Sequence, residues 1–418
     1  MKLLTASQTR EADAFTMQHE GISSTDLMER AAKAFTGWFE NKFQPGKEVH
    51  IFCGPGNNGG DGLAVARMLH ERGYNVQPYL VGDTSKASEE FKVNRKRLPE
   101  QISVKHVTQE QDVPALKDKA CVIDALFGTG LNRPVTGLYA ALIQALNGSG
   151  ATITSIDIPS GLYTDSQTPE EGAIVRASYT ISFELPKLAF LLPQHEEYVG
   201  EWHVVPIGLS QQFISDAKTD LYLTTQADVQ HLLKPRRKFS HKGLYGHALL
   251  LFGGYGKMGA AVMAARACLR SGVGLLTLQV PQAGYTVLQT AVPEAMTLTD
   301  KHRKHLSELP PDIDKFDVIG IGPGLGTERV TKTTVGQLLA TASHPMVVDA
   351  DAINIIASRD KLKSQLYKKK LIFTPHPKEF ERLVGKVKNN YDRLQHLREF
   401  CMEYGCYVAL KGSHTAIG

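Results

Sequence analysis

The sequence predicts an α/β protein of two domains, each built on a parallel sheet with helices on both faces. Three observations lead to this expectation. The chain has 418 residues, more than one small core needs. Short apolar runs alternate with helix-length segments in both halves, which is typical of βαβ units. Many of these runs end in glycine or polar residues, as strands do at the sheet edge where open α/β proteins bind ligands.

The first half begins with an expected amphipathic helix at 23–40, in which Asp26 and Glu29 have the spacing of a capping arrangement. The run VHIFC at 49–53 has strand length and precedes a glycine-rich turn. A helix-like segment, LAVARMLHERG, then closes at Gly73. Three further strands are expected at 75–82, 120–128 and 151–161.

The second half repeats this rhythm with a strand at 247–254 and a helix of small residues at 260–272. Later apolar runs are expected to be buried strands: LLTLQVP, FDVIGIGPGLG, PMVVDADAIN, LIFTPHP and YVALKGSHT. The stretch 209–225 has weak periodicity and predicts the boundary, so the expected domains are 1–215 and 225–418.

Composition points to a globular enzyme in the cytoplasm. Apolar residues make up 42% of the chain and the net charge is +4, which is too balanced to suggest a nucleic-acid partner. The basic run KPRRKFSHK at 234–242 is consistent with a phosphate contact or with a solvated inter-domain stretch. The five cysteines are odd in number and lack metal-ligand spacing, which favours reduced thiols, and Cys53 and Cys121 are expected in the core.

The sequence also indicates where the protein is located and what kind of partner it binds. No apolar run reaches membrane-spanning length, and the N-terminus meets charge too early for a signal peptide. We therefore expect a cytoplasmic homo-oligomer that acts on small molecules, without a nucleic-acid or membrane partner.

The densest motif is GPGNNGGDG at 54–62, with five glycines in nine residues. Glycines between a strand and a helix let backbone amides approach a ligand closely. The motif lacks both the GxGxxG dinucleotide fingerprint and the GK[ST] ending of a P-loop, which argues against a standard NAD dehydrogenase or NTPase. Its Asn and Asp oxygens suit a hard cation or ribose hydroxyls. A purely structural tight turn is the alternative.

Two more strand ends in this half carry polar residues: Asp124 in DALFGTG, and Asp157 with Ser160 in SIDIPSG. Parallel strands of one sheet end on the same edge, so these groups are expected to converge with the glycine-rich turn. Lys187 lies in the apolar run ELPKLAFLLP. Either a carboxylate pairs with its ammonium, or the side chain extends along apolar surface and places the ammonium in solvent.

LMERA at 27–31, GPGNNGGDG, DALFGTG and SIDIPSG together resemble the NAD(P)HX epimerase family, whose fold is a Rossmann-like αβα domain. The resemblance implies that one set of residues contacts the hydrated cofactor: Asn57, Asn58, Gly59, Gly60, Asp61, Gly128, Thr129, Gly130, Leu131, Asn132, Arg133, Pro134 and Asp157. It also implies a potassium ion held by Asn58, Asp124 and Ser160.

In this family NADHX carries a hydroxyl at C6 of the reduced nicotinamide, and epimerisation interconverts its R and S forms. The resemblance makes Asp157 the leading catalytic candidate. Our hypothesis is that Asp157 acts as the acid/base, with Lys187 as its electrostatic partner.

In the second half, five segments in order resemble the ADP-dependent NAD(P)HX dehydratase, a ribokinase-like fold: GGYGKMGAA, GIGPGLG, DADAIN, TPHPKEF and LKGSHT. The resemblance implies that NADPHX is bound by Ala260, Gly324 and His376. It implies ADP with Mg²⁺, and nucleotide contacts from Lys411, Gly412, Ser413, His414 and Thr415.

Taken alone, these segments are weaker evidence. GGYGKMG is not a Walker motif, and a histidine between two prolines, as His376 is, can be a packed loop residue. Lys378 stands where the family usually has glycine.

The chain up to Gly418 contains no G-x-G-D loop, whose glycines would form an anion hole and whose aspartate would activate the hydroxyl. We therefore expect the second half to be incomplete and to present part of a site without catalysing dehydration. The alternatives are a ribokinase-type vitamin kinase with an accessory domain, and a nucleotide-binding scaffold without turnover.

Overall fold

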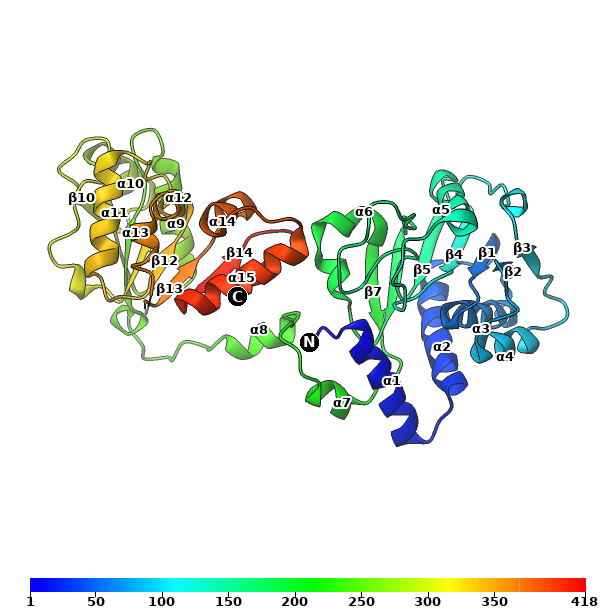
Figure 1. The fold of residues 1–418 in the computed structure, drawn as a ribbon. Coiled ribbons are helices and arrows are strands. Elements are labelled where there is room, and N and C mark those ends of the chain that lie inside the picture. The colour runs from blue at the N-terminus through cyan, green and yellow to red at the C-terminus, as the bar shows by residue number, and fades with distance from the viewer. Residues whose placement is uncertain (368) are drawn as a thin grey trace. The chain divides into compact units, whose positions relative to one another are not determined.

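A computed structural model describes residues 1–367 and 369–418. The chain divides into two compact units, Met1–Leu233 and Lys234–Gly418 (Figure 1). Both are α/β units built on parallel sheets, which confirms the predicted fold class.

The expected boundary stretch 209–225 lies inside the first unit. It carries a short helix and then pairs with the N-terminus: Leu3 donates a backbone hydrogen bond to Leu221 (3.0 Å), and Leu223 donates one to Met1 (2.8 Å). Weak periodicity here marks a segment that packs along another part of its own domain, and the division between the units comes after Leu233.

The first unit has a seven-stranded, all-parallel sheet in the order β3-β2-β1-β4-β5-β6-β7. Its strands are β1 Glu48–Cys53, β2 Asn75–Val81, β3 Lys105–Val107, β4 Cys121–Ala125, β5 Thr152–Ile156, β6 Tyr179–Phe183 and β7 Glu201–Val205. Its helices are α1 Ala6–Glu20, α2 Ser24–Lys42, α3 Asn57–Glu71, α4 Glu89–Arg97, α5 Gly137–Gly148, α6 Glu196–Val199, α7 Gln211–Asp216 and α8 Gln226–Leu232.

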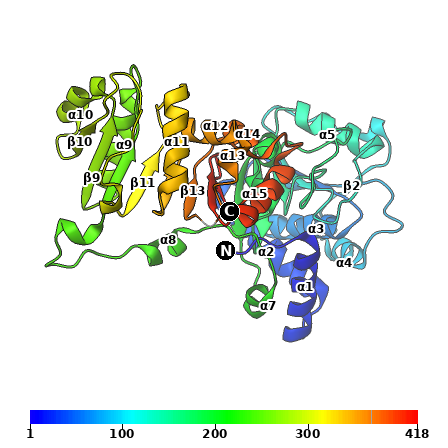
Figure 2. The same cartoon turned by 60° about the vertical axis from the view of Figure 1, so that its left-hand side comes forward.

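Helices cover both faces of this sheet because its central strands are apolar on both sides (Figure 2). On β1, Val49, Ile51 and Cys53 pack into the core made with α2, α3 and α4. Phe52 points to the other face, where it stacks on Tyr79 with ring centroids 4.6 Å apart in the core beneath α5. The period-2 alternation of the strand thus divides one apolar run between two cores.

Two expected helix starts are corrected. The cap of α2 is formed by Ser23, not by Asp26 and Glu29: the Ser23 hydroxyl accepts from the Asp26 amide (3.1 Å) and the Asp26 carboxylate accepts from the Ser23 amide (2.9 Å). Glu29 instead binds Arg67 and Arg97. The expected glycine-rich turn is largely helical as well, since α3 begins at Asn57.

The second unit has eight strands in the order β10-β9-β8-β11-β12-β13-β14-β15, parallel except for β15, which runs antiparallel to β14. The strands are β8 His247–Leu251, β9 Leu275–Val280, β10 Met296–Thr299, β11 Val318–Ile321, β12 Met346–Val348, β13 Leu371–Phe373, β14 Tyr407–Leu410 and β15 Ala416–Ile417. The helices are α9 Met258–Arg270, α10 Tyr285–Ala291, α11 Arg329–Thr341, α12 Ala350–Ala357, α13 Asp360–Lys363, α14 Pro377–Val384 and α15 Asn390–Tyr404. Every strand predicted for this half is present.

Cys53 and Cys121 are buried, as predicted, and all five cysteines are free thiols. Within residues 1–367 and 369–418, no helix combines the length and the apolar character needed to span a bilayer. The basic run 234–242 is almost entirely exposed.

Candidate active site

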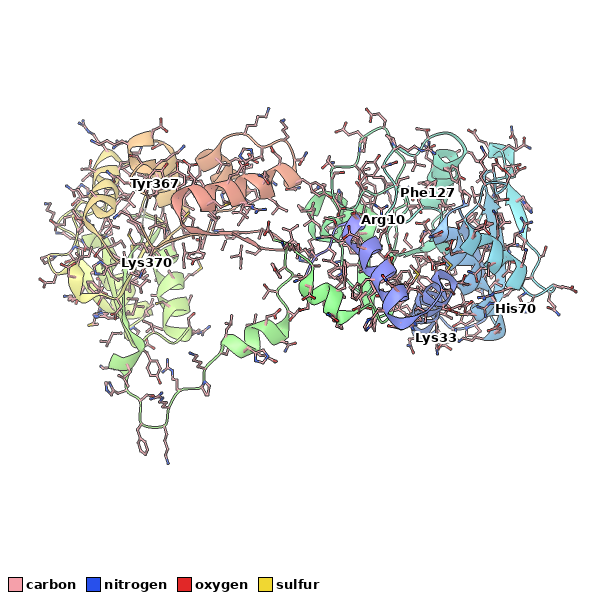
Figure 3. All side chains as sticks on the ribbon, turned by 60° about the horizontal axis from the view of Figure 1, so that its bottom comes forward. Arg10, Lys33, His70, Phe127, Tyr367 and Lys370 are labelled. Carbon is pink, nitrogen blue, oxygen red and sulfur yellow. The ribbon has the colours of Figure 1, made fainter. Side chains whose placement is uncertain are left out.

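A cavity of about 1040 Å³ opens in the first unit, where β1, β4 and β5 end. The start of α3 and the loop after β4 form part of its wall, and α1 and α2 supply further side chains. The lining comprises Thr9, Arg10, Asp13, Met17, Ser24, Leu27, Met28, Ala31, Pro55, Gly56, Asn57, Asn58, Asp61, Glu90, residues 126–136, Tyr139, Asp157, Phe183, Ile207 and Leu209. Figure 3 labels two of these residues, Arg10 on α1 and Phe127 just after β4.

Asp157 and Lys187 form an ion pair at this cavity. Lys187 Nζ lies 2.5 Å from Asp157 Oδ1 and 2.6 Å from Ser182 Oγ. The Lys187 side chain is 4% exposed, so its charge is held by the carboxylate and does not reach solvent. Asp157 lines the cavity and Lys187 lies behind it, which leaves the carboxylate as the group that faces a ligand.

The backbone at Asp157 turns sharply after β5. Asp157 has a φ of 65°, in the left-handed region that non-glycine residues seldom adopt. Its amide donates to the carbonyl of Ile181 on the neighbouring strand β6 (2.8 Å). This hydrogen bond fixes the turn and directs the Asp157 carboxylate toward Lys187. Asp157 therefore combines a strained backbone conformation with the ion pair.

The glycine-rich motif serves the cavity in two ways. Asn57, Asn58 and Asp61 line it from the first turns of α3, whereas Gly59 and Gly60 are buried behind them. A Cβ on Gly59 would lie 1.7 Å from the carbonyl oxygen of Gly54, so this glycine lets the helix start pack directly on the preceding loop. Gly59 therefore allows the helix start to pack on the loop, and it is not a point where a ligand approaches the backbone.

The second predicted binding segment, 128–134, lines the cavity in full. It follows β4, and Leu131 donates a backbone hydrogen bond to Gly128 (3.4 Å) that closes a turn within it. Gly128 lies beside Asn58, whose Oδ1 would be 3.6 Å from a Cβ on that glycine. The two predicted segments thus meet at one wall.

Of the residues predicted to hold potassium, Asp124 and Ser160 are in direct contact, and Asn58 lies beside Gly128. Asp124 is fully buried and accepts from the Ser160 hydroxyl (2.6 Å), the Ser155 hydroxyl (2.7 Å) and the Ser160 amide (2.9 Å). Burial raises the pKa of Asp124, while the hydrogen bonds from Ser160 and Ser155 lower it. Asn58 is 7% exposed, and its Nδ2 has no hydrogen-bond partner among the described residues.

Sequence reasoning missed the acidic residues that α1 and α4 bring to the cavity. Burial raises the pKa of Asp13 to about 6; the negative charge of Asp157 adds to this and Lys187 opposes it. Burial, followed by Asp157, Asp13 and Glu90, raises the pKa of Asp61 well above its usual range. Thr9, Asp13 and Met17 recur every four residues, which places them on one helix face, but the spacing does not say what that face meets.

In the second unit, the predicted glycine loops converge. Gly324 has a φ of 74°, and a Cβ there would lie 3.3 Å from Ala260 Cβ, 3.3 Å from Gly253 Cα and 3.0 Å from the Lys257 carbonyl oxygen. The loops after β8 and β11 are therefore in close contact at the carboxyl edge of the sheet, and they bring Ala260 and Gly324 together.

The other predicted residues of this unit lie at the ends of β13 and β14. His376 caps α14, since its Nδ1 accepts from the amides of Lys378 (3.2 Å) and Glu379 (3.4 Å). Lys411 Nζ lies 3.0 Å from Asp349 Oδ1 after β12, and its amide donates to the Pro375 carbonyl (2.9 Å).

Residues 411–415 are exposed. Lys378 is exposed too, and its backbone closes the His376 cap.

Together the fold and the cavity define a class: an α/β enzyme of two units, each built on a largely parallel sheet, with a cavity at the carboxyl edge of the first sheet. Two family models match the chain, the YjeF-related protein N-terminus over residues 24–189 and NAD(P)H-hydrate dehydratase over residues 248–418.

The chain is 34% identical to the bifunctional NAD(P)H-hydrate repair enzyme Nnr of Moorella thermoacetica, covering 100% of this chain and 82% of that protein. It is 33% identical to the enzyme of the same name from Coxiella burnetii, covering 98% and 82%. An ADP/ATP-dependent NAD(P)H-hydrate dehydratase structure from Bacillus subtilis is 30% identical, covers 46% of this chain and 68% of that one, and has a TM-score of 0.37. The chain belongs to the family of bifunctional NAD(P)H-hydrate repair enzymes.

Proposed function

We propose that the first unit interconverts the R and S forms of hydrated NADH and NADPH at C6. The observation that carries this is the ion pair of Asp157 and Lys187 at a cavity walled by both predicted cofactor-binding segments. The cavity volume, about 1040 Å³, falls at the upper end of small-molecule sites and suits a dinucleotide. Membership of the repair family supports the same reaction.

In this proposal residues 57–61 and 128–134 hold the hydrated cofactor, with Asn57, Asn58 and Asp61 contributing side chains. Asp157 faces C6 of the ring and acts there as a general acid or base. Ser182 accepts a hydrogen bond from the Lys187 ammonium, which in turn holds the Asp157 carboxylate in one position. Asp157 is thus a catalytic residue, and Lys187 a positioning residue.

Turnover of R-NADHX to S-NADHX, followed by chromatographic separation of the epimers, tests the proposal. Asp157→Asn should slow the reaction by roughly 10²- to 10⁴-fold, the usual contribution of a general acid or base. Lys187→Met should also slow it, and the exposed residue Lys33 on α2 offers the matched control Lys33→Met, which should leave the rate unchanged. A full rate in Asp157→Asn would overturn the assignment of Asp157.

We also propose a potassium ion bound by Asn58, Asp124 and Ser160. The donor set supports it: three side-chain oxygens, one from a buried carboxylate, suit a hard cation. A bound cation would offset the charge of Asp124, and its ligands would link the start of α3 to the ends of β4 and β5.

Removal of potassium should therefore lower the thermal stability of the first unit, and adding KCl should restore it more fully than equal ionic strength from LiCl. Asp124→Asn should abolish the difference between the two salts. Equal stabilisation by both salts in the unaltered chain would argue against a specific site.

For the second unit we propose binding of hydrated NAD(P)H at Ala260, Gly324 and His376, and of ADP with Mg²⁺ at residues 411–415. The support is the contact between the loops of Ala260 and Gly324 and the match to the dehydratase family. Lys411 is held by Asp349 at 3.0 Å, which presents its ammonium at the carboxyl edge of the sheet. Calorimetric titration with ADP and Mg²⁺ tests this: Lys411→Ala should weaken binding, and Lys370→Ala, outside the proposed site, should not.

We infer a cytoplasmic location from the five free thiols, which are typical of proteins in reducing compartments. Cell fractionation tests it, and recovery in an oxidising compartment would contradict it.

A further inference from the structure

Asp13 is an acidic residue in the cavity to which neither the motifs nor the family resemblance gave a role. It lies on α1, and Asp157 lies at the end of β5, far away in the sequence. Both side chains line the same cavity. A ligand in that cavity therefore meets carboxyl groups from two separate walls.

Inversion at C6 calls for two such groups. If the C6 hydroxyl leaves as water from one face of the ring, water must return to the other face to give the opposite epimer. One group must donate a proton as the C–O bond breaks, and another must accept a proton as the new bond forms. Two carboxyl groups separated by the reacting ring perform the equivalent tasks in inverting glycoside hydrolysis.

We propose that Asp13 is the second acid–base residue of the epimerisation, acting together with Asp157. This inference rests on the proposed function of the first unit. Protonated Asp13 donates its proton to the C6 hydroxyl, the C6–O bond breaks, and its electron pair leaves with the water. The ring nitrogen's lone pair then forms the C6=N1 double bond.

Water next adds to C6 from the other face. Its proton goes to the Asp157 carboxylate, and the electron pair of the C=N bond returns to nitrogen. The product has the opposite configuration with no net change in atoms or electrons. The proton has moved from one aspartate to the other, so the pair is set for the reverse conversion and the next forward turnover needs only a proton exchange with water.

The electrostatics of the cavity support Asp13 as the proton donor and Asp157 as the proton acceptor. Burial and the charge of Asp157 raise the pKa of Asp13 to about 6, whereas Lys187 forms its ion pair with Asp157. Besides Asp13, the charged groups that line the cavity are Arg10, Asp61, Glu90, Arg133 and Asp157, with Lys187 behind Asp157.

Two of these groups are less suitable as the second acid–base residue. Burial raises the pKa of Asp61 well above its usual range, which disfavours the carboxylate form that would have to take a proton back. Glu90 is engaged with the Ser24 hydroxyl at 2.6 Å.

The test is the pH dependence of R-to-S conversion in the full chain, in Asp13→Asn, in Asp13→Glu and in Glu11→Gln. Glu11 is an exposed acid on the same helix and serves as the matched control. In the unaltered chain, kcat in the R-to-S direction should fall as the pH rises through about 6, because Asp13 loses the proton it must donate.

Asp13→Asn should lower kcat by roughly 10²-fold or more and remove this descending limb, since the remaining rate no longer depends on that proton. Asp13→Glu should recover part of the rate together with the limb. Glu11→Gln should match the unaltered chain in both respects.

Different results would overturn the proposed function and the assignment of Asp13. If the unaltered chain does not epimerise NADHX, the proposed function fails and Asp13 has no role in it. If the chain epimerises and Asp13→Asn keeps either the full rate or the same descending limb, the proposed function stands and the assignment of Asp13 is overturned. Circular dichroism and the affinity for NADPH, measured on each variant, identify a misfolded protein, in which case Asp13→Glu carries the test.

Discussion

At the scale of single residues, the site depends on charges that the fold holds away from water. Lys187 is nearly inaccessible and has Asp157 and Ser182 as its partners. Removing one member of such a buried pair leaves the charge of the other without a partner. Replacing either residue alone therefore lowers the stability of the protein. For Asp13, burial is the main reason that the pKa is raised, and the charge of Asp157 adds to it.

Asp13 should therefore lower the stability of the first unit at neutral pH. Its pKa is raised from 3.8 to about 6, so the folded state binds the proton more tightly than the unfolded state. The free energy of unfolding consequently falls as the pH rises through this window, and the loss is complete above it. Asp13→Asn avoids that loss and should stabilise the unit at pH ~7.5 by at most about 3 kcal/mol, with the gain vanishing toward pH ~4.

Urea unfolding followed by tryptophan fluorescence measures this effect in the first unit alone, because both tryptophans, Trp38 and Trp202, lie there. Glu11→Gln should show no such pH-dependent gain. A pH-independent difference between Asp13→Asn and the unaltered chain would mean that ionisation of Asp13 is not its cause.

At the scale of elements, the start of α3 matters most. The helix begins directly in the glycine-rich motif, so its first turns carry Asn57, Asn58 and Asp61 into the cavity. This geometry requires the helix start to touch the loop after β1, which only glycine at position 59 permits. Packing at one residue thus determines the position of the binding groups around it.

Gly59→Ala should destabilise the first unit by at least ~2 kcal/mol, because the new Cβ would lie 1.7 Å from the Gly54 carbonyl oxygen and backbone would have to move. Gly37→Ala in α2 is the matched control, since a Cβ there meets nothing within 4 Å. That change should stabilise the protein by about 0.5–1 kcal/mol through helix propensity. Urea midpoints for the two variants measure both, and similar values would refute the packing argument.

At the scale of the whole molecule, the two units are joined by an exposed and basic stretch. Residues 234–239 are exposed and lie outside the helices and strands. Exposed segments without regular structure are where proteases cut first. The stretch thus behaves as the solvated connection that its composition indicated.

Brief treatment with trypsin should therefore cut first after Arg236, Arg237 or Lys238 and release two fragments that match the two units. Mass spectrometry of the first products checks the positions. Replacing these three residues by glutamine should delay the cleavage. Early cuts inside either unit would contradict the expectation.

Much of the fold was predictable because strand-forming runs carry a local signal. Each expected strand formed, and the polar residues at strand ends converged because parallel strands end on one edge. The start expected for α2 was close to the observed one, but its cap was misassigned, because spacing alone does not show that Ser23 and Asp26 form the capping box together. The start of α3 was placed too late because its first turn lies within the glycine-rich motif.

The sequence by itself determined the α/β class, the strands, the two families and the strand-end residues from Asp124 to Ser160, since all of these depend on short-range pattern and motif. Tertiary structure alone decided that Lys187 is buried on Asp157 and that α1 lines the cavity. It also decided that Asp13 shares that cavity with Asp157. The physical reason is that burial and ion pairing depend on which segments, distant in sequence, pack against one another. The pKa of a residue depends in turn on its burial and on the charges beside it.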